Sequence, residues 1–200
     1  MKALILAGGK NKRMGQNKAL LKLNGETIIE NQIRLLRGIF EETLIITNSP
    51  REYQHLKVRM IEDVIPQKGP LGGIYSGLFY SESFYNFFLA CDIPFPNVNL
   101  IAYMRNCVGN EDVIIPRGTG FEPLFAFYSK DCLLPMKKQI DSESLRITDF
   151  LSRVKVRVLE TQELNKFDPG GVSFFNINTR EDLKKARNMA RLNTSTRMNT

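Results

Sequence analysis

Histidine, tryptophan and cysteine are scarce in this sequence of 200 residues. It has no tryptophan and a single histidine, His55, which excludes a metal site built from several histidines and leaves one candidate for a Ser-His-Asp triad. Because this histidine lies in a polar stretch, we interpret it as a surface residue. Free thiols favour a reducing compartment, so we expect a cytoplasmic protein. The cysteines are odd in number and include no CxxC pair, which argues against a disulfide framework or a zinc ribbon: Cys91, Cys107 and Cys132.

Long hydrophobic runs are absent as well. The first apolar run, residues 3–7, ends at Gly8 and Gly9 and is too short for the core of a signal peptide or for a membrane span. No later run reaches a spanning length, so we expect no membrane partner. With 42% hydrophobic and 24% charged residues, a chain of this length can bury its own core. We therefore expect one domain over residues 1–192, followed by a disordered tail at 193–200 without apolar periodicity.

The charges are unbalanced, with 28 Lys and Arg against 21 Asp and Glu and a formal net charge of +7. Such an excess favours anionic partners, which include nucleic acids, phosphorylated metabolites and nucleotides. Basic residues at 184–197 are typical of the solvated face of a terminal helix and carry little information. A second basic group surrounds a glycine-rich segment and is more informative: Lys10, Lys12, Arg13, Lys18 and Lys22.

Apolar runs alternate with helical periodicity along the first half of the chain. Four runs have the continuous apolar character of strands buried on both faces: 3–7, 43–47, 86–91 and 112–115. Three segments between them have the apolar spacing of helices: 27–40, 71–83 and 97–107. This alternation predicts an α/β fold with a mostly parallel sheet and right-handed crossovers.

The second half is less regular and indicates an irregular or antiparallel edge of the sheet. Thr179 is a suitable N-cap for a last helix, because Glu181 and Asp182 then lie in its first turn, where the helix dipole favours acids. Four further elements are predicted before it: a strand over 124–128, helices over 131–140 and 144–153, and an alternating strand over 154–159.

The segment LAGGKNKRMGQNKALL, at residues 6–21, is the strongest local signal. Its glycines allow backbone amides to approach a phosphate, and Arg13 and Lys18 can neutralise that phosphate. The Walker A pattern GxxxxGK[ST] and the dinucleotide pattern GxGxxG are both missing. We therefore predict a phosphate-binding loop of another kind; the alternative is a glycine turn with solvated lysines.

Four later segments carry further patterns: GPLGGIYSGL at 69–78, DIPF at 92–95, EPLFAFY at 122–128 and NINTREDL at 176–183. Together with the glycine-rich segment, they resemble, in order and over nearly the whole chain, the blocks of the molybdenum cofactor guanylyltransferases. The resemblance implies a Rossmann-like, three-layer α/β/α nucleotidyltransferase fold. Asn11 and Asn17 depart from the pattern, since the family usually has a small residue at the first position and often an Asp at the second. These departures bear on the rigidity of the loop and the orientation of Lys18.

Asp92 directly follows the apolar run at 86–91. A lone carboxylate at the carboxyl end of a strand suits a Mg²⁺ that bridges nucleotide phosphates, because Mg²⁺ keeps most of its waters and needs only one or two protein carboxylates. The alternative is a turn-forming aspartate before Ile93 and Pro94. The resemblance favours the first interpretation and implies that Asp92 is the metal and triphosphate ligand.

The resemblance also implies roles for the other residues of these blocks. The expected catalytic residues are Arg13, Lys18 and Asp92. The expected nucleotide contacts are Leu6, Ala7, Gly8, Gly9, Gly15, Lys18, Asn48, Asp63, Gly69, Pro70, Leu71 and Asp92. The expected acceptor contacts are Glu122, Pro123, Asn176 and Asn178. For several of these the alternative is structural, since Asn and Asp at strand ends are common turn residues and the two late asparagines can act as plain caps.

The implied reaction transfers GMP from GTP to molybdopterin in the presence of Mg²⁺, giving molybdopterin guanine dinucleotide and pyrophosphate. An acceptor phosphate is already ionised and needs no general base, which agrees with the lack of a catalytic histidine. Other proteins of the molybdenum cofactor pathway are expected partners by the same resemblance.

Three other functions stay open. Two keep the fold: a cytidylyltransferase acting on the same cofactor, and a nucleotidyltransferase acting on a sugar or polyol phosphate. The third is a non-catalytic nucleotide or nucleic-acid binding module that uses the basic loop. We disfavour it and expect no nucleic-acid partner, because the aromatic residues cluster in predicted strands, where core packing explains them better than base stacking.

Overall fold

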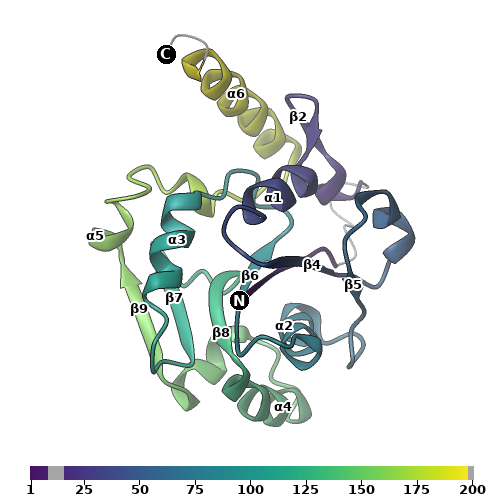
Figure 1. Cartoon of the computed structure of the whole chain (residues 1–200), viewed down its shortest axis with the longest axis vertical. Coiled ribbons are helices and arrows are strands. Elements are labelled where there is room, and N and C mark those ends of the chain that lie inside the picture. The colour runs from purple at the N-terminus through teal and green to yellow at the C-terminus, as the bar shows by residue number, and fades with distance from the viewer. Residues whose placement is uncertain (9–15, 198–200) are drawn as a thin grey trace.

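A seven-stranded sheet forms the middle of the computed structural model, which describes residues 1–8 and 16–197 (Figure 1). The strands are β1 (Lys2–Leu6), β4 (Glu42–Ile46), β5 (Met60–Ile61), β6 (Tyr85–Ala90), β7 (Val113–Arg117), β8 (Phe125–Ser129) and β9 (Val156–Glu160). Their order across the sheet is β5-β4-β1-β6-β8-β7-β9. Of these seven, β8 alone runs antiparallel to its neighbours. The α/β fold with a mostly parallel sheet is therefore confirmed.

One feature of that prediction needs correction: the antiparallel strand lies inside the sheet and not at its edge. β8 pairs with β6 on one side and β7 on the other, and all five of its residues are buried. The edge strand on this side of the sheet is β9, which pairs parallel with β7 and has one buried residue, Leu159. The unbroken apolar sequence of β8 is that of an inner strand, and the alternating sequence of β9 is that of an outer one.

Helices cover both faces of the sheet, so the molecule has the expected three layers (Figure 1). Alternate residues of β1 point to opposite faces. Ala3 and Ile5 belong to the core beneath α1 (Ile28–Leu36) and α3 (Val98–Asn106), whereas Leu4 and Leu6 belong to the core beneath α2 (Gly69–Tyr80) and α4 (Leu133–Asp141). The remaining elements are the hairpin β2 (Lys22–Leu23) and β3 (Glu26–Thr27), α5 (Thr161–Leu164), α6 (Arg180–Arg197), and the 3-10 helices η1 (Lys18–Leu20), η2 (Pro50–Leu56), η3 (Lys130–Cys132), η4 (Ile147–Arg153) and η5 (Val172–Phe174).

Capping residues explain where several helices begin. Thr27 caps α1 through a capping box with Glu30, and the bonds from Thr27 hold the pKa of the Glu30 carboxyl below its usual value. Thr179 and Asp182 exchange hydrogen bonds at the start of α6, as the sequence predicted. The helix predicted over 144–153 is the shorter 3-10 helix η4.

Helix α2 lies very close to the sheet because small residues face it. A Cβ added at Gly77 would lie 2.6 Å from Ile46 Cδ1 and 2.7 Å from Leu4 Cδ2, and one at Gly73 would lie 2.8 Å from Leu6 Cδ2. The helix begins at Gly69, two residues before the predicted start. This close packing brings the amino end of α2 to the carboxyl end of β1.

Helix α6 projects from the body of the molecule and ends near the C-terminus (Figure 1). Its first half packs on the hairpin side through Leu183 and Ala186. The helix continues to Arg197, through residue 192, where the sequence predicted that the domain gives way to a tail. That division stays a prediction. No helix among the described residues is long and apolar enough to cross a membrane.

Candidate functional site

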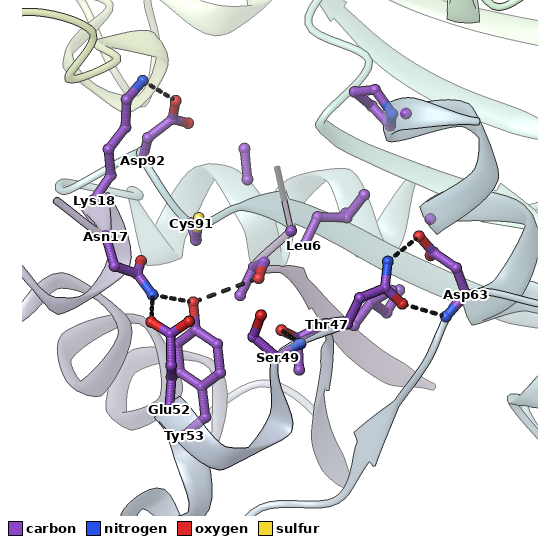
Figure 2. A pocket seen from close by; sticks show the side chains of 18 of the residues that line it. Leu6, Asn17, Lys18, Thr47, Ser49, Glu52, Tyr53, Asp63, Cys91 and Asp92 are labelled. Atoms are coloured by element: carbon purple, nitrogen blue, oxygen red, sulfur yellow. Dashed lines mark hydrogen bonds and ion pairs between the residues drawn. The ribbon is translucent and has the colours of Figure 1, made fainter. Parts of the chain in front are cut away.

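A cavity of about 1060 Å³ lies at the carboxyl ends of the parallel strands. The segments that follow β1, β4, β5 and β6 all reach it, through Gly8, Asn48, Asp63 and Asp92. Ligands of open α/β sheets bind at this edge, because strand ends and helix amino ends converge there. Figure 2 shows Lys18 and Asp92 at one end of the cavity and Asp63 at the other.

Most of the residues predicted to contact the nucleotide line this cavity. They are Leu6, Ala7, Gly8, Lys18, Asn48, Asp63, Gly69, Pro70 and Asp92. Leu71 does not, because its side chain is fully buried in the core beneath α2. Gly9, Arg13 and Gly15 lie outside the described residues, as does the departure at Asn11.

Lys18, Asp92 and Asn178 meet at one end of the cavity although they are far apart in sequence. The Lys18 ammonium donates to Asp92 Oδ2 at 3.3 Å and to Asn178 Oδ1 at 2.7 Å. The Lys18 side chain is 13% exposed and that of Asp92 is 23% exposed, so the pair is partly shielded from water. Two oxygens of different segments therefore face one cation. Asn176, two residues earlier, bonds instead to the carbonyl of Phe174 at 3.1 Å.

The backbone around Asp92 is tied to the rest of the site. The Cys91 amide donates to the Leu6 carbonyl at 3.1 Å, and the Ile177 amide donates to the Asp92 carbonyl at 3.0 Å. The second of these bonds brings the segment of Asn178 to the end of β6. Burial raises the pKa of the Cys91 thiol to about 12, so this cysteine is not a reactive thiolate.

A hydrogen-bonded group that the sequence did not reveal links the two ends of the glycine-rich segment. Asn17 Nδ2 donates to Glu52 Oε2 and to the Tyr53 hydroxyl, both at 2.7 Å (Figure 2). Asn17 Oδ1 accepts from the Ala19 amide at 3.0 Å. The Tyr53 hydroxyl donates to the Ala7 carbonyl at 3.4 Å. Burial raises the pKa of this tyrosine to about 12, so it stays protonated.

This group of hydrogen bonds positions the start of η1, which carries Lys18. Asn17 caps the 3-10 helix that begins with Lys18, and Tyr53 joins that cap to the end of β1. The sequence marked Asn17 as a departure from the family pattern, which was the available signal. Nothing in the spacing marked Glu52 or Tyr53, because they lie on η2, in a segment without a motif.

Asn48 and Asp63 form a pair at the other end of the cavity. Asn48 Nδ2 donates to Asp63 Oδ2 at 2.7 Å, and the Asp63 amide donates to Asn48 Oδ1 at 3.0 Å. These two bonds fix both side chains at the ends of β4 and β5. Their remaining donor and acceptor positions are available to a ligand.

The amino end of α2 forms the wall beside this pair. Gly69 has φ +59°, a left-handed conformation that glycine adopts without strain, and Pro70 follows at the start of the helix. Gly73 lies against Leu6 too closely for any side chain. The helix therefore presents its amino end, with its partial positive charge, to the cavity.

Comparison with known proteins identifies the family. The MobA-like NTP transferase domain matches residues 3–156. The chain belongs to this family. A probable molybdenum cofactor guanylyltransferase of Natranaerobius thermophilus is 41% identical over 192 residues, which cover 92% of this chain and 94% of that protein. The molybdenum cofactor guanylyltransferase of Syntrophotalea carbinolica is 35% identical, covering 92% and 90%.

Solved structures agree with this assignment. Molybdopterin-guanine dinucleotide biosynthesis protein A from Archaeoglobus fulgidus superposes with a TM-score of 0.80 at 27% identity, over 96% of this chain and 99% of that one. As a member of the MobA-like family, the chain is a nucleotidyltransferase with the expected α/β nucleotidyltransferase fold.

The predicted acceptor residues lie beside the cavity of this MobA-like domain. Leu124 lines it, whereas Glu122 and Pro123 do not. Burial raises the pKa of the Glu122 carboxyl to about 7, and no described residue donates a hydrogen bond to this carboxyl. The Pro123 carbonyl accepts from the Tyr128 hydroxyl at 2.6 Å.

Histidine and cysteine chemistry has no place in this site. His55 is exposed on η2, which confirms its interpretation as a surface residue. The three cysteines are free, as the sequence predicted. Among residues 1–8 and 16–197, no three His, Cys, Asp or Glu side chains come together closely enough to form a metal site by themselves.

Proposed function

We propose that this chain is a molybdenum cofactor guanylyltransferase, which transfers GMP from GTP to molybdopterin. The terminal phosphate oxygen of molybdopterin attacks the α-phosphorus of GTP, the bond from that phosphorus to the bridging oxygen breaks, and pyrophosphate leaves. The names of the relatives support the reaction, and the cavity at the carboxyl ends of the strands has a size that suits a nucleotide.

The cluster of Lys18, Asp92 and Asn178 is the observation that carries this proposal. A nucleotidyl transfer needs little covalent help from the protein; it needs alignment of the two phosphates and neutralisation of their charge. Lys18 supplies a fixed positive charge beside the cavity, held at 2.7 Å by Asn178. No general base is required, because the attacking phosphate is already ionised.

The residues of this cluster also fit a Mg²⁺. Asp92 Oδ2 and Asn178 Oδ1 are hard oxygen donors that already face one cation, the Lys18 ammonium. One carboxylate and one amide oxygen are sufficient protein ligands when phosphate oxygens and waters supply the others. When bound, the metal would neutralise the phosphates of the nucleotide. Lys18 would then contact phosphate directly.

The pair of Asn48 and Asp63 favours guanine as the base. Guanine presents two neighbouring N–H donors and one carbonyl acceptor on its pairing edge, and a carboxylate with an amide can satisfy all three. Cytosine presents one donor and two acceptors, which a carboxylate serves poorly. The bonds between Asn48 and Asp63 hold the carboxylate ready for this contact.

The test is the turnover of GTP, CTP and ATP by the purified protein with molybdopterin and Mg²⁺, followed through pyrophosphate release. We expect GTP to be used and Asp92→Ala to abolish the transfer. Asp141→Ala is the matched control, because this exposed carboxylate lies on α4 and pairs with Lys137 there. Turnover of CTP in place of GTP would overturn the guanylyl assignment. Turnover with a sugar phosphate but not with molybdopterin would overturn the assignment of molybdopterin as the acceptor.

A further inference from the structure

A buried glutamine on α1 holds the turn that carries Asp92. The Gln32 side chain is fully buried, and its Nε2 donates to the Ala90 carbonyl at 2.9 Å and to the Ile93 carbonyl at 2.7 Å. The Ile93 amide in turn donates to the Ala90 carbonyl at 3.3 Å, which closes a four-residue turn. One amide group of Gln32 therefore joins the first and last residues of this turn, and Asp92 is its third residue.

The stability that Gln32 brings through its two hydrogen bonds is offset in part by an unpaired atom of the same side chain. Gln32 Oε1 has no hydrogen-bond partner among the described residues, and a buried polar atom left in this way costs about 1–3 kcal/mol. An apolar side chain of similar length would remove that atom and leave the Ile93 carbonyl without its donor instead. The number of buried polar atoms without a partner would hardly change, although the two hydrogen bonds from Nε2 would be lost. What would change is the restraint on the turn.

The same helix holds the next residue of the loop as well. Asn31 Nδ2 donates to the Pro94 carbonyl at 3.1 Å, while the Asp92 carbonyl accepts from the Ile177 amide at 3.0 Å. Four carbonyls of the segment 90–94 are thus fixed by donors from α1, the turn itself and the segment before α6. The Asp92 carboxylate, by contrast, faces the cavity and the Lys18 ammonium.

We propose that Gln32 is a positioning residue for the transfer reaction: it fixes the Ala90–Ile93 turn and thereby aims the Asp92 carboxylate at the cation site. Gln32 does not line the cavity and acts through Asp92 alone. The inference rests on the proposed function for its effect on catalysis. Its structural part, the restraint of the turn, can be measured without any activity.

The chain offers a close control for a buried glutamine. Gln139 on α4 is also fully buried, its Nε2 donates to the Arg146 carbonyl at 2.8 Å, and its Oε1 also lacks a partner among the described residues. It contacts neither the turn nor the cavity. A loss that comes only from removing a buried amide will appear in both variants, whereas a loss of positioning will appear in one.

The experiment compares Gln32→Met with Gln139→Met, since methionine has a similar length and shape. Four quantities are measured: the melting temperature, the hydrogen exchange of the Ile93 amide, the Mg²⁺-dependent affinity for GTP, and kcat with KM.

We expect the two variants to have similar melting temperatures. In Gln32→Met, exchange at Ile93 should be faster and kcat should fall about 10- to 100-fold, the order expected when a catalytic group is displaced by about 1 Å. More Mg²⁺ should be needed for half-maximal GTP binding, and the KM for GTP should change less than kcat. Gln139→Met should match the wild type in all but melting temperature.

The outcomes separate the role of Gln32 from the proposed function. If the wild type transfers GMP and both variants keep its kcat and its Mg²⁺ dependence, Gln32 does not position Asp92. If the wild type does not transfer GMP, the proposed function fails; faster exchange at Ile93 in Gln32→Met alone would still support the restraint of the turn, and equal exchange in both variants would overturn it. Gln32→Leu serves as a second variant should methionine prevent folding.

Discussion

Two groups of residues differ in how completely their side chains are held: the predicted nucleotide side, which lines the cavity, and the predicted acceptor side, which lies beside it. On the nucleotide side, Asn17, Asn48 and Asp63 each make hydrogen bonds to neighbouring segments, and the turn of Asp92 is fixed through its backbone. On the acceptor side, defined here by Glu122 and Pro123, the carboxylate is partly buried and receives no hydrogen bond from the described residues. The side chains of the predicted nucleotide side are thus already held in place, whereas the predicted acceptor side has one carboxyl that no described residue satisfies.

Replacing Lys18 should have the largest effect on the predicted nucleotide side. Lys18→Ala removes the positive charge that Asp92 and Asn178 hold beside the cavity. We expect kcat/KM for GTP to fall about 100- to 1000-fold, the usual effect of removing a group that stabilises charge in the transition state. Steady-state pyrophosphate release measures it. Lys22→Ala is the control, because Lys22 is exposed on β2 and does not line the cavity; an equal loss in both variants would show that net charge, and not the cluster, is responsible.

Replacing Asp63 should affect nucleotide binding at the other end of the cavity. Asp63→Ala removes the carboxylate proposed to accept from guanine and leaves Asn48 without its partner. GTP affinity should weaken about 10- to 100-fold, the range for a hydrogen bond to a charged group, with a smaller effect on kcat. Calorimetric titration with GTP and ATP measures this. Equal weakening for both nucleotides would contradict the role in base selection.

The sequence predicted which residues line the cavity better than it predicted strand direction inside the sheet. Continuous apolar runs identify β1 and β6 as buried strands, and Asp92 directly follows the run at 86–91 that predicted β6. The apolar sequence of β8 indicates burial but says nothing of strand direction, so its antiparallel course between two strands was not foreseen.

Side-chain contacts across long stretches of chain were the other gap. Lys18 and Asn178 were each predicted from their own motif, yet nothing in the spacing showed that they bond across 160 residues. Gln32 and Tyr53 lie in segments without a motif, and their partners are 36 to 61 residues away. Local patterns report propensity and periodicity; such pairs depend on how the elements pack.

The pH dependence of stability tests the environment of Glu122, on the predicted acceptor side. The folded protein holds a proton on this carboxyl up to about pH 7, whereas the unfolded chain releases it near its ordinary pKa of 4.5. Folding is therefore most favoured below pH 4.5 with respect to this group, and this contribution is lost as the pH rises to about 7. Glu122→Gln stays neutral, so it should gain about 1–2 kcal/mol over the wild type between pH 4.5 and 8, after allowance for partial exposure.

Urea unfolding of both proteins at pH 5 and pH 8 measures this difference, because the other titrating groups cancel in the comparison. GTP affinity should be the same in both proteins, which would separate the acceptor side from the nucleotide side. A constant difference in stability across the pH range would show that the Glu122 carboxyl titrates normally.

The smallest expected effect belongs to the hydroxyl that joins the two ends of the glycine-rich segment. Tyr53→Phe removes one bond to Asn17 and one to the Ala7 carbonyl. We expect about 1 kcal/mol of lost stability, together with a several-fold rise in the KM for GTP, because Asn17 then holds Lys18 less firmly. Tyr85→Phe is the matched control, since the Tyr85 hydroxyl donates to the Gly109 carbonyl at 2.7 Å, away from the cavity. Both variants should lose similar stability in urea unfolding. If KM rises in the Tyr85 variant, or does not rise in the Tyr53 variant, the bonds of Tyr53 between η2 and β1 support only the fold. Asp92 and Asn178 then hold Lys18 without help from Tyr53.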